Sequence, residues 1–97
     1  MPQTNYQRGY RLERLAVKQL RDKGYYVVRS AGSHGAVDLV AFNRQEIILI
    51  QVGVKGRKGA ADIEMLRRVH GPAGVTSRQM WLWDSKAREW LVVEPLQ

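Results

Sequence analysis

The sequence predicts one α/β domain: a mixed central β-sheet flanked by helices, with the element order αβββαββ. Two patterns predict this class. A long amphipathic helix is followed by three β-rich segments, and the third of these segments is apolar on both faces. A short helix and two alternating strands complete the order. A chain of 97 residues has room for one core, so we expect residues 1–97 to form a single domain.

The first helix is expected to begin at Thr4, which forms a capping-box pattern with Gln7, and to run to about Lys23. Gly24 is the residue that ends it. The two faces of this helix differ, because one is apolar and the other is basic. The apolar face carries Leu12, Ala16 and Leu20, and the basic face carries Arg11, Arg14, Lys18 and Arg21.

Three strands are expected over residues 25–29, 36–42 and 46–54. A loop rich in Gly and Ser, residues 30–35, separates the first strand from the second. A turn at residues 43–45 separates the second strand from the third. The third strand contains the run Ile-Ile-Leu-Ile, which is apolar on both faces and predicts a central strand covered on both sides.

The second half of the chain completes the domain with three shorter elements. A helix is expected over residues 61–70, with Ile63 and Leu66 facing inward. Two alternating strands are expected over residues 78–84 and 89–93, joined by a short turn. These elements would add two strands and a second helix to the sheet.

The charge of the chain indicates the kind of partner. Sixteen Lys and Arg against nine Asp and Glu leave a net charge of +7. In a domain of this size, such a charge favours a polyanionic partner, with nucleic acid ahead of a membrane surface. A solvated basic surface without a partner would give the same composition.

Composition also bears on the compartment. Cysteine is absent, which excludes disulfides, zinc fingers and thiol catalysis and fits a reducing environment. No apolar run reaches the roughly 18 residues of a membrane span. We therefore expect a cytoplasmic protein that is not embedded in a membrane, associated with the nucleoid or, if the gene is viral, present in the host cytoplasm.

Three polar residues interrupt otherwise apolar segments. Asp38 lies between Val37 and Leu39, Gln51 ends the longest apolar run, and Glu13 lies at the edge of the buried face of the first helix. If the second and third strands form a hairpin, Asp38 and Gln51 lie side by side. Oxygen ligands from three segments suit a hard cation such as Mg²⁺ or Mn²⁺. Alternatively, Asp38 caps the loop and Gln51 satisfies backbone groups.

Four segments of roughly the first 55 residues form a recognisable pattern. They are Gly9-x-x-x-Glu13-Arg14, Val27-Val28-Arg29-Ser30-Ala31-Gly32-Ser33, Val37-Asp38-Leu39-Val40-Ala41 and Ile48-Leu49-Ile50-Gln51-Val52. This pattern resembles the archaeal-type Holliday junction resolvases of the PD-(D/E)xK nuclease superfamily. The resemblance implies a restriction-endonuclease-like fold and a homodimer that binds four-way DNA junctions by shape. It also implies cutting of opposing strands with Mg²⁺, for which Mn²⁺ would substitute.

The resemblance also assigns roles to residues. Glu13 matches the glutamate of the first helix, Asp38 the metal-binding aspartate, and Gln51 the acidic position of the E-x-K element. The main-chain carbonyl of Val52 would complete the metal ligands. Ser33 belongs to the serine-bearing loop of the family and is expected at the catalytic centre. The expected DNA contacts are Arg11, Arg14, Arg29, Ser30, His34, Lys55, Arg57 and Lys58.

Two positions depart from the family pattern. Gln51 replaces a carboxylate, which lowers metal affinity although its carbonyl oxygen can still coordinate. Gly53 stands where the family has the lysine that orients or deprotonates water and offsets phosphate charge. Lys55 lies about 6–7 Å further along the same strand face and could swing back over Gly53. We therefore expect Lys55 to act as the catalytic lysine.

Two alternatives remain open at this point. In the first, the site has decayed and the protein binds junctions without cutting them. In the second, the chain is a related nuclease that acts on other DNA substrates.

Overall fold

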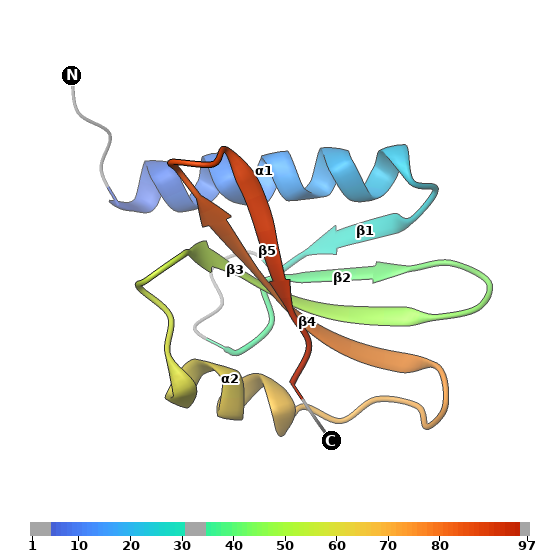
Figure 1. The fold of residues 1–97 in the computed structure, drawn as a ribbon. Helices are drawn as coiled ribbons and strands as arrows, with labels where there is room; N and C mark the ends of the chain where they lie inside the picture. The colour runs from blue at the N-terminus through green and yellow to red at the C-terminus, as the bar shows by residue number, and fades with distance from the viewer. Residues whose placement is uncertain (1–4, 31–34, 96–97) are drawn as a thin grey trace.

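The computed structural model describes residues 5–30 and 35–95, and it has the predicted order αβββαββ (Figure 1). The elements are α1 (Asn5–Asp22), β1 (Tyr26–Arg29), β2 (Leu39–Phe42), β3 (Ile47–Val54), α2 (Ala60–Arg67), β4 (Thr76–Asp84) and β5 (Glu89–Val93). Most bounds agree with the expected ones to within two residues. The exceptions are β2, which begins three residues late, and α2, which ends three residues early.

The five strands form one mixed sheet in the order β1-β2-β3-β4-β5. Neighbouring strands are antiparallel except β3 and β4, which are parallel and are joined through α2. The hairpin of β2 and β3 pairs Leu39 with Ile50, which confirms the hairpin that the site prediction required. Figure 1 shows α1 and α2 on opposite sides of the sheet.

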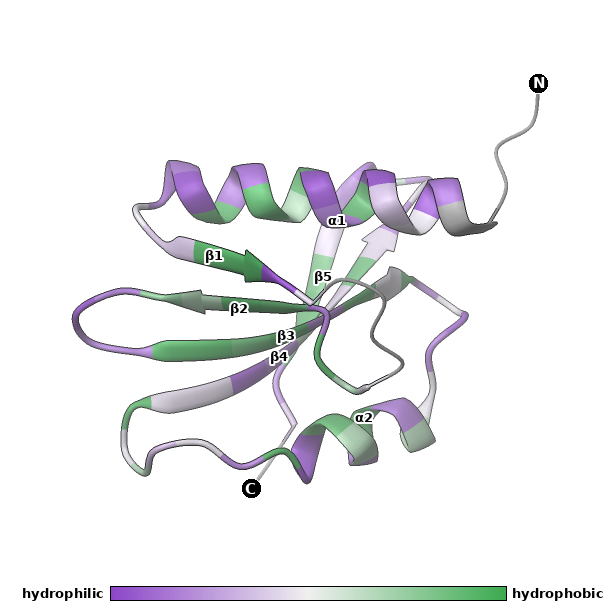
Figure 2. Cartoon of the chain, turned by 180° about the vertical axis from the view of Figure 1, so that it is seen from behind, coloured by the Kyte–Doolittle hydropathy of each residue, from purple (hydrophilic) through white to green (hydrophobic). Residues whose placement is uncertain are grey.

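Two apolar cores hold these layers together. The larger core joins Leu12, Ala16 and Leu20 of α1 to residues of β1–β4, among them Ile50. The smaller core lies on the other side of the sheet, where Leu66 of α2 packs on β4. The central strand β3 is buried along most of its length, which confirms the prediction from its apolar run. Figure 2 shows the hydrophobic residues concentrated along the strands and in bands on α1.

The first helix has the faces that the sequence predicts. Leu12, Ala16 and Leu20 are buried. The basic residues Arg11, Arg14, Lys18 and Arg21 are exposed. The helix ends before Gly24, whose φ of +92° is a conformation that glycine adopts without strain. Thr4, the expected first residue, lies outside the described residues.

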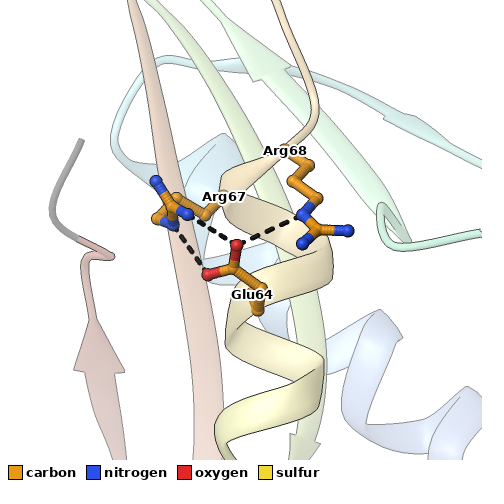
Figure 3. A network of polar contacts seen from close by, with 3 residues as sticks. All are labelled: Glu64, Arg67 and Arg68. Atoms are coloured by element: carbon orange, nitrogen blue, oxygen red, sulfur yellow. Dashed lines mark hydrogen bonds and ion pairs between the residues drawn. The ribbon is translucent and has the colours of Figure 1, made fainter.

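The second helix ends in a small network of charged side chains (Figure 3). Glu64 accepts hydrogen bonds from both Arg67 and Arg68. These contacts, led by the hydrogen bonds from Arg67, lower the pKa of Glu64 to about 2. Arg67 is also the last residue of α2, so its positive charge complements the negative end of the helix dipole.

None of the helices in the described part of the chain is long and apolar enough to cross a bilayer.

Candidate active site

Asp38 is fixed against the start of the hairpin by its main chain. Its N–H donates to the carbonyl oxygen of Ile50 at 2.8 Å, and its carbonyl oxygen accepts from the N–H of Ser30 at 2.9 Å. Both bonds lie just outside β2, between β1 and β3. The ladder of β2 and β3 ends where Leu39 pairs with Ile50, and Asp38 and Gln51 are the residues that follow this pair on the two chain segments. The two predicted ligands therefore lie at the same end of the hairpin.

The carboxylate of Asp38 is also held directly. Its Oδ2 accepts a hydrogen bond from the N–H of Val52 at 2.9 Å. Burial raises the pKa of Asp38, while the bond from Val52 and the positive charge of Lys58 act in the opposite direction. The net direction is upward, so the charged form of this carboxylate is poorly compensated by the protein alone.

Gln51 is the only buried polar residue among those described, with 7% of its surface exposed. Ile48, Ile50 and Val52 point into the larger core, so the alternation of strand side chains directs Gln51 to the α2 side. Its Oε1 atom is buried and has no hydrogen-bond partner among the described residues. An unpaired buried acceptor costs roughly 1–3 kcal/mol, so such an atom calls for a specific explanation.

Glu13 joins this region from α1. Its Oε1 accepts a hydrogen bond from Nε of Arg29 at 3.3 Å. Burial raises the pKa of Glu13, and the negative charge of Asp38 raises it further, against the lowering effect of Arg29. Because the charge of Asp38 acts on the pKa of Glu13, the two carboxylates are close enough for their charges to interact. The guanidinium of Arg29 also stacks over the ring of Tyr10 at 4.7 Å.

Together these residues offer two carboxylates and one amide oxygen from three different elements. No group of three or more His, Cys, Asp or Glu residues gathers in the described ranges, so an all-acidic metal centre is not formed there. The donor set that does form is composed of oxygens, which hard divalent cations prefer. A cation held between Asp38 and Gln51 would pair the Oε1 atom that has no hydrogen-bond partner among the described residues. The residues present therefore fit Mg²⁺ or Mn²⁺.

The structure corrects the expected position of Lys55. The strand β3 ends at Val54, and its parallel partner brings Trp83 opposite that residue. Lys55 therefore lies beside Asp84, and its Nζ donates to Oδ2 of Asp84 at 3.2 Å. The ammonium group of Lys55 does not swing back over Gly53, because it is engaged in this ion pair.

A different lysine covers Gly53. A Cβ atom at Gly53 would lie 2.7 Å from Cγ and 2.9 Å from Cε of Lys58. The methylene stem of Lys58 thus occupies the space that a side chain at position 53 would need. The sequence placed Lys58 only among the DNA contacts. The pair Gly53 and Gly56 is the sequence signal that could have identified Lys58. Gly53 has no side chain and leaves room for the stem of Lys58, and Gly56 has a positive φ that lets the chain reverse direction after β3.

The remaining predicted site residues fall into two groups. Ser33 and His34 lie outside the described residues. Ser30 follows β1 and is exposed, and Arg57 is exposed in the loop after β3. Their DNA contacts, and the metal contact of the Val52 carbonyl, stay predictions.

A basic cleft runs along α1 toward this region. Its charged lining is Arg8, Arg11, Arg14, Lys18, Arg21 and Asp22 from α1, Arg29 from β1, and Arg88 from the turn between β4 and β5. The apolar part of the lining includes Val54 and Trp83 of the sheet. Because Arg29 also binds Glu13, the cleft leads from the basic face of α1 to the carboxylates. The arrangement places basic side chains next to Glu13, one of the candidate metal ligands.

Two comparisons with known proteins bear on the family and the fold of the chain. The model of the archaeal Holliday junction resolvase (Hjc) family matches residues 4–69, which is more than half of the chain. The structure is similar to that of Archaeoglobus fulgidus Hjc, a Holliday junction resolvase from an archaeal hyperthermophile, with a TM-score of 0.64 and 23% sequence identity. The similarity covers 90% of this chain and 72% of the other, which supports the restriction-endonuclease-like fold. The chain therefore belongs to the archaeal Holliday junction resolvase family.

Proposed function

We propose that this protein cuts four-way DNA junctions with a divalent metal ion, Mg²⁺ in the first place, bound by Asp38, Gln51 and Glu13. The observation that carries the proposal is the buried Oε1 of Gln51, which has no hydrogen-bond partner among the described residues and lies at the end of the hairpin that also carries the Asp38 carboxylate. A cation there would pair the orphan oxygen and compensate the carboxylates whose pKa values burial has raised. Bound in this position, the ion would neutralise charge on the scissile phosphate and activate water.

The protein's own residues would prepare this site in three ways. The N–H of Val52 orients the Asp38 carboxylate through its hydrogen bond at 2.9 Å. Arg29 orients Glu13 and keeps a positive charge beside it. Gln51 supplies a neutral ligand, so the site carries one negative charge less than a site of three carboxylates and should bind metal more weakly.

The basic cleft supports the choice of DNA as the substrate. Its seven basic side chains line one cleft, in a chain whose net charge is +7. Arg and Lys at such a surface contact phosphates and release counterions, which makes binding strongly dependent on salt. Branched DNA would supply phosphates from more than one duplex arm.

A cleavage assay tests the proposal. A synthetic four-way junction and a linear duplex of the same sequence are incubated with the protein and Mg²⁺, Mn²⁺ or EDTA. We expect paired incisions in the junction with either metal, and none in EDTA or in the linear duplex. Absence of incision at every metal concentration would contradict the enzymatic proposal, and equal cutting of the linear duplex would favour a nuclease of other substrates.

Gly53 favours one second candidate function, which is junction binding without cutting. The family's lysine position holds no side chain here, and Lys55 is bound to Asp84. Such a protein would bind the junction equally well with and without Mg²⁺. It would also bind equally well after Asp38→Ala, and neither form would cut.

We also propose that the protein acts as a homodimer. The edge strand β5 leaves Leu91 and Val92 exposed, at 45% and 43% of their surface, at one end of the sheet. Apolar side chains at an unpaired edge are typical of a surface that a second chain covers. Light scattering should give twice the mass of 11.1 kDa, and Leu91→Lys should shift the mass toward the monomer.

A further inference from the structure

We propose that Lys58 serves as the catalytic lysine of this protein, reaching the site from the loop before α2 across the open space at Gly53. The inference rests on the proposed function, which supplies the metal and the phosphate. It explains why the family's lysine position can hold glycine while the remaining ligands stay in place.

The first observation that supports the inference is the packing of Lys58 on Gly53. Gly53 lies two residues beyond Gln51 on the same strand, so positions 51 and 53 face the same side of the sheet. The stem of Lys58 lies so close to Gly53 that no Cβ could be added without displacing it. Lys58 therefore enters the space where a lysine at position 53 would begin.

The loop is shaped to return this lysine to the strand. Gly56 has a φ of +89°, and the N–H of Arg57 donates to the carbonyl oxygen of Val54 at 3.0 Å, which closes a tight turn. The N–H of Gly59 then donates to Oδ2 of Asp62 at 3.0 Å, at the first turn of α2. The residue between these two fixed points is Lys58, so its backbone is held on both sides.

Charge distinguishes Lys58 from the other lysine of the loop. The stem of Lys58 lies over Gly53, on the face of β3 toward which Gln51 also points, so its charge lies on the side of the proposed metal ligands. Lys55 instead pairs with Asp84. Among the described residues, Lys58 has no ion-pair partner, so its ammonium can meet a water molecule or a phosphate oxygen.

The chemistry asked of Lys58 involves no covalent bond. Hydrolysis of a phosphodiester builds negative charge on the oxygens of the phosphoryl group, and a fixed cation beside them stabilises that charge. An ammonium group also donates up to three hydrogen bonds and can orient the attacking water. Lys58 would do both from the same side of the sheet as Gln51.

The first test compares lysine variants in single-turnover cleavage of a junction bound to excess protein. We expect Lys58→Ala to slow cutting at least about a hundredfold, with a much smaller change in junction affinity. Lys55→Ala should slow cutting far less than Lys58→Ala does. Lys23→Ala, the same change at the far end of α1, is the matched control and should cut as the parent does. Equal rates for Lys58→Ala and the control would overturn the inference.

A relocation variant tests the geometry. Gly53→Lys combined with Lys58→Ala returns the lysine to the strand while removing the stem that occupies its space. We expect this double variant to recover a large part of the activity that Lys58→Ala loses. Gly53→Ala should slow cutting, because its methyl group displaces Lys58, and circular dichroism would confirm that the variant is folded. A fully active, folded Gly53→Ala protein would contradict the proposed path of Lys58.

A second readout does not depend on cleavage. A cation beside a metal site repels the metal, so Lys58→Ala should bind Mn²⁺ about threefold to tenfold more tightly in the absence of DNA. Lys23→Ala should bind it as the parent does. If the parent binds Mn²⁺ but does not cut junctions, the enzymatic proposal fails. The difference in Mn²⁺ affinity between the parent and Lys58→Ala then decides alone whether Lys58 lies beside the metal site. If the parent neither binds Mn²⁺ nor cuts, both proposals are overturned.

Discussion

The main-chain N–H of Val52 donates a hydrogen bond to Oδ2 of Asp38 at 2.9 Å, and this contact fixes the carboxylate at the end of the β2–β3 hairpin. The ladder of β2 and β3 ends where Leu39 pairs with Ile50, so Asp38 and Gln51 lie at the same end of the hairpin. Strand pairing and the bond from Val52 therefore bring together the two residues that we propose as the central metal ligands.

Asp38→Asn should abolish cutting and stabilise the metal-free protein. Because the folded pKa of Asp38 lies above its ordinary value of 3.8, the folded state binds the proton more tightly than the unfolded chain. This contribution to stability is complete below pH 3.8 and is lost as the pH rises through the folded pKa. At pH 7 in EDTA, we expect the Asp38→Asn substitution to raise the melting temperature by about 2–5 °C. A lower melting temperature would indicate that the charged carboxylate stabilises the apo fold.

Gln51→Glu should raise the affinity for the metal ion and lower the stability of the metal-free protein. A third carboxylate adds negative charge to the ligand set, so the Mg²⁺ concentration for half-maximal cutting should fall several-fold. The same charge lies in a buried position near Asp38, so the metal-free melting temperature should drop. Calorimetric titration with Mn²⁺ and thermal melting in EDTA check both effects.

The matched variant Gln51→Leu removes the unpaired oxygen while keeping a buried side chain of similar size. It should raise the apo melting temperature and eliminate cutting. An active Gln51→Leu protein would show that Oε1 is not a metal ligand.

Arg14→Ala should weaken junction binding through loss of phosphate contact. Arg14 lines the basic cleft and lies over the ring of Tyr10 at 5.8 Å. We expect the slope of log affinity against log salt to fall by about 1, with no change in the preference for junction over duplex. Arg44→Ala, an equal charge loss at the β2–β3 turn, is the control. Identical salt slopes for the two variants would place the DNA on another face.

Glu64 should titrate far below an ordinary glutamate. Its pKa is lowered to about 2, chiefly by the hydrogen bonds from Arg67 (Figure 3). Any stability from this ion pair is present above pH 4.5 and is lost only as the pH falls through about 2. In an NMR titration of the carboxyl carbon, Arg67→Ala should return the pKa toward 4.5 more than Arg68→Ala does. The opposite ranking would show that Arg68 is the main partner.

The fold could be predicted because its signals are local. The spacing of Leu12, Ala16 and Leu20 places one face of α1 in the core, and the apolar run of β3 requires cover on both sides. The hairpin of β2 and β3 follows from a short turn between two strands. These features depend on residues close in sequence, so periodicity was sufficient to find them.

The position of the lysine could not be predicted, because it depends on contacts distant in sequence. Lys55 meets Asp84 only because β3 pairs in parallel with β4, and no sequence pattern fixes that register. Lys58 reaches Gly53 only through the left-handed turn at Gly56. Alternation along the strand suggested Lys55, but the strand ends at Val54, so the alternation does not extend to that residue.

The central claim is that Asp38 and Gln51 bind a divalent metal ion, and a crystal structure of the protein soaked with Mn²⁺ tests it most directly. The account predicts an anomalous peak within coordination distance of a carboxylate oxygen of Asp38 and of Oε1 of Gln51, with Lys58 lying over Gly53. An ordered Mn²⁺ ion bound elsewhere, with Oε1 of Gln51 still unpaired, would contradict it.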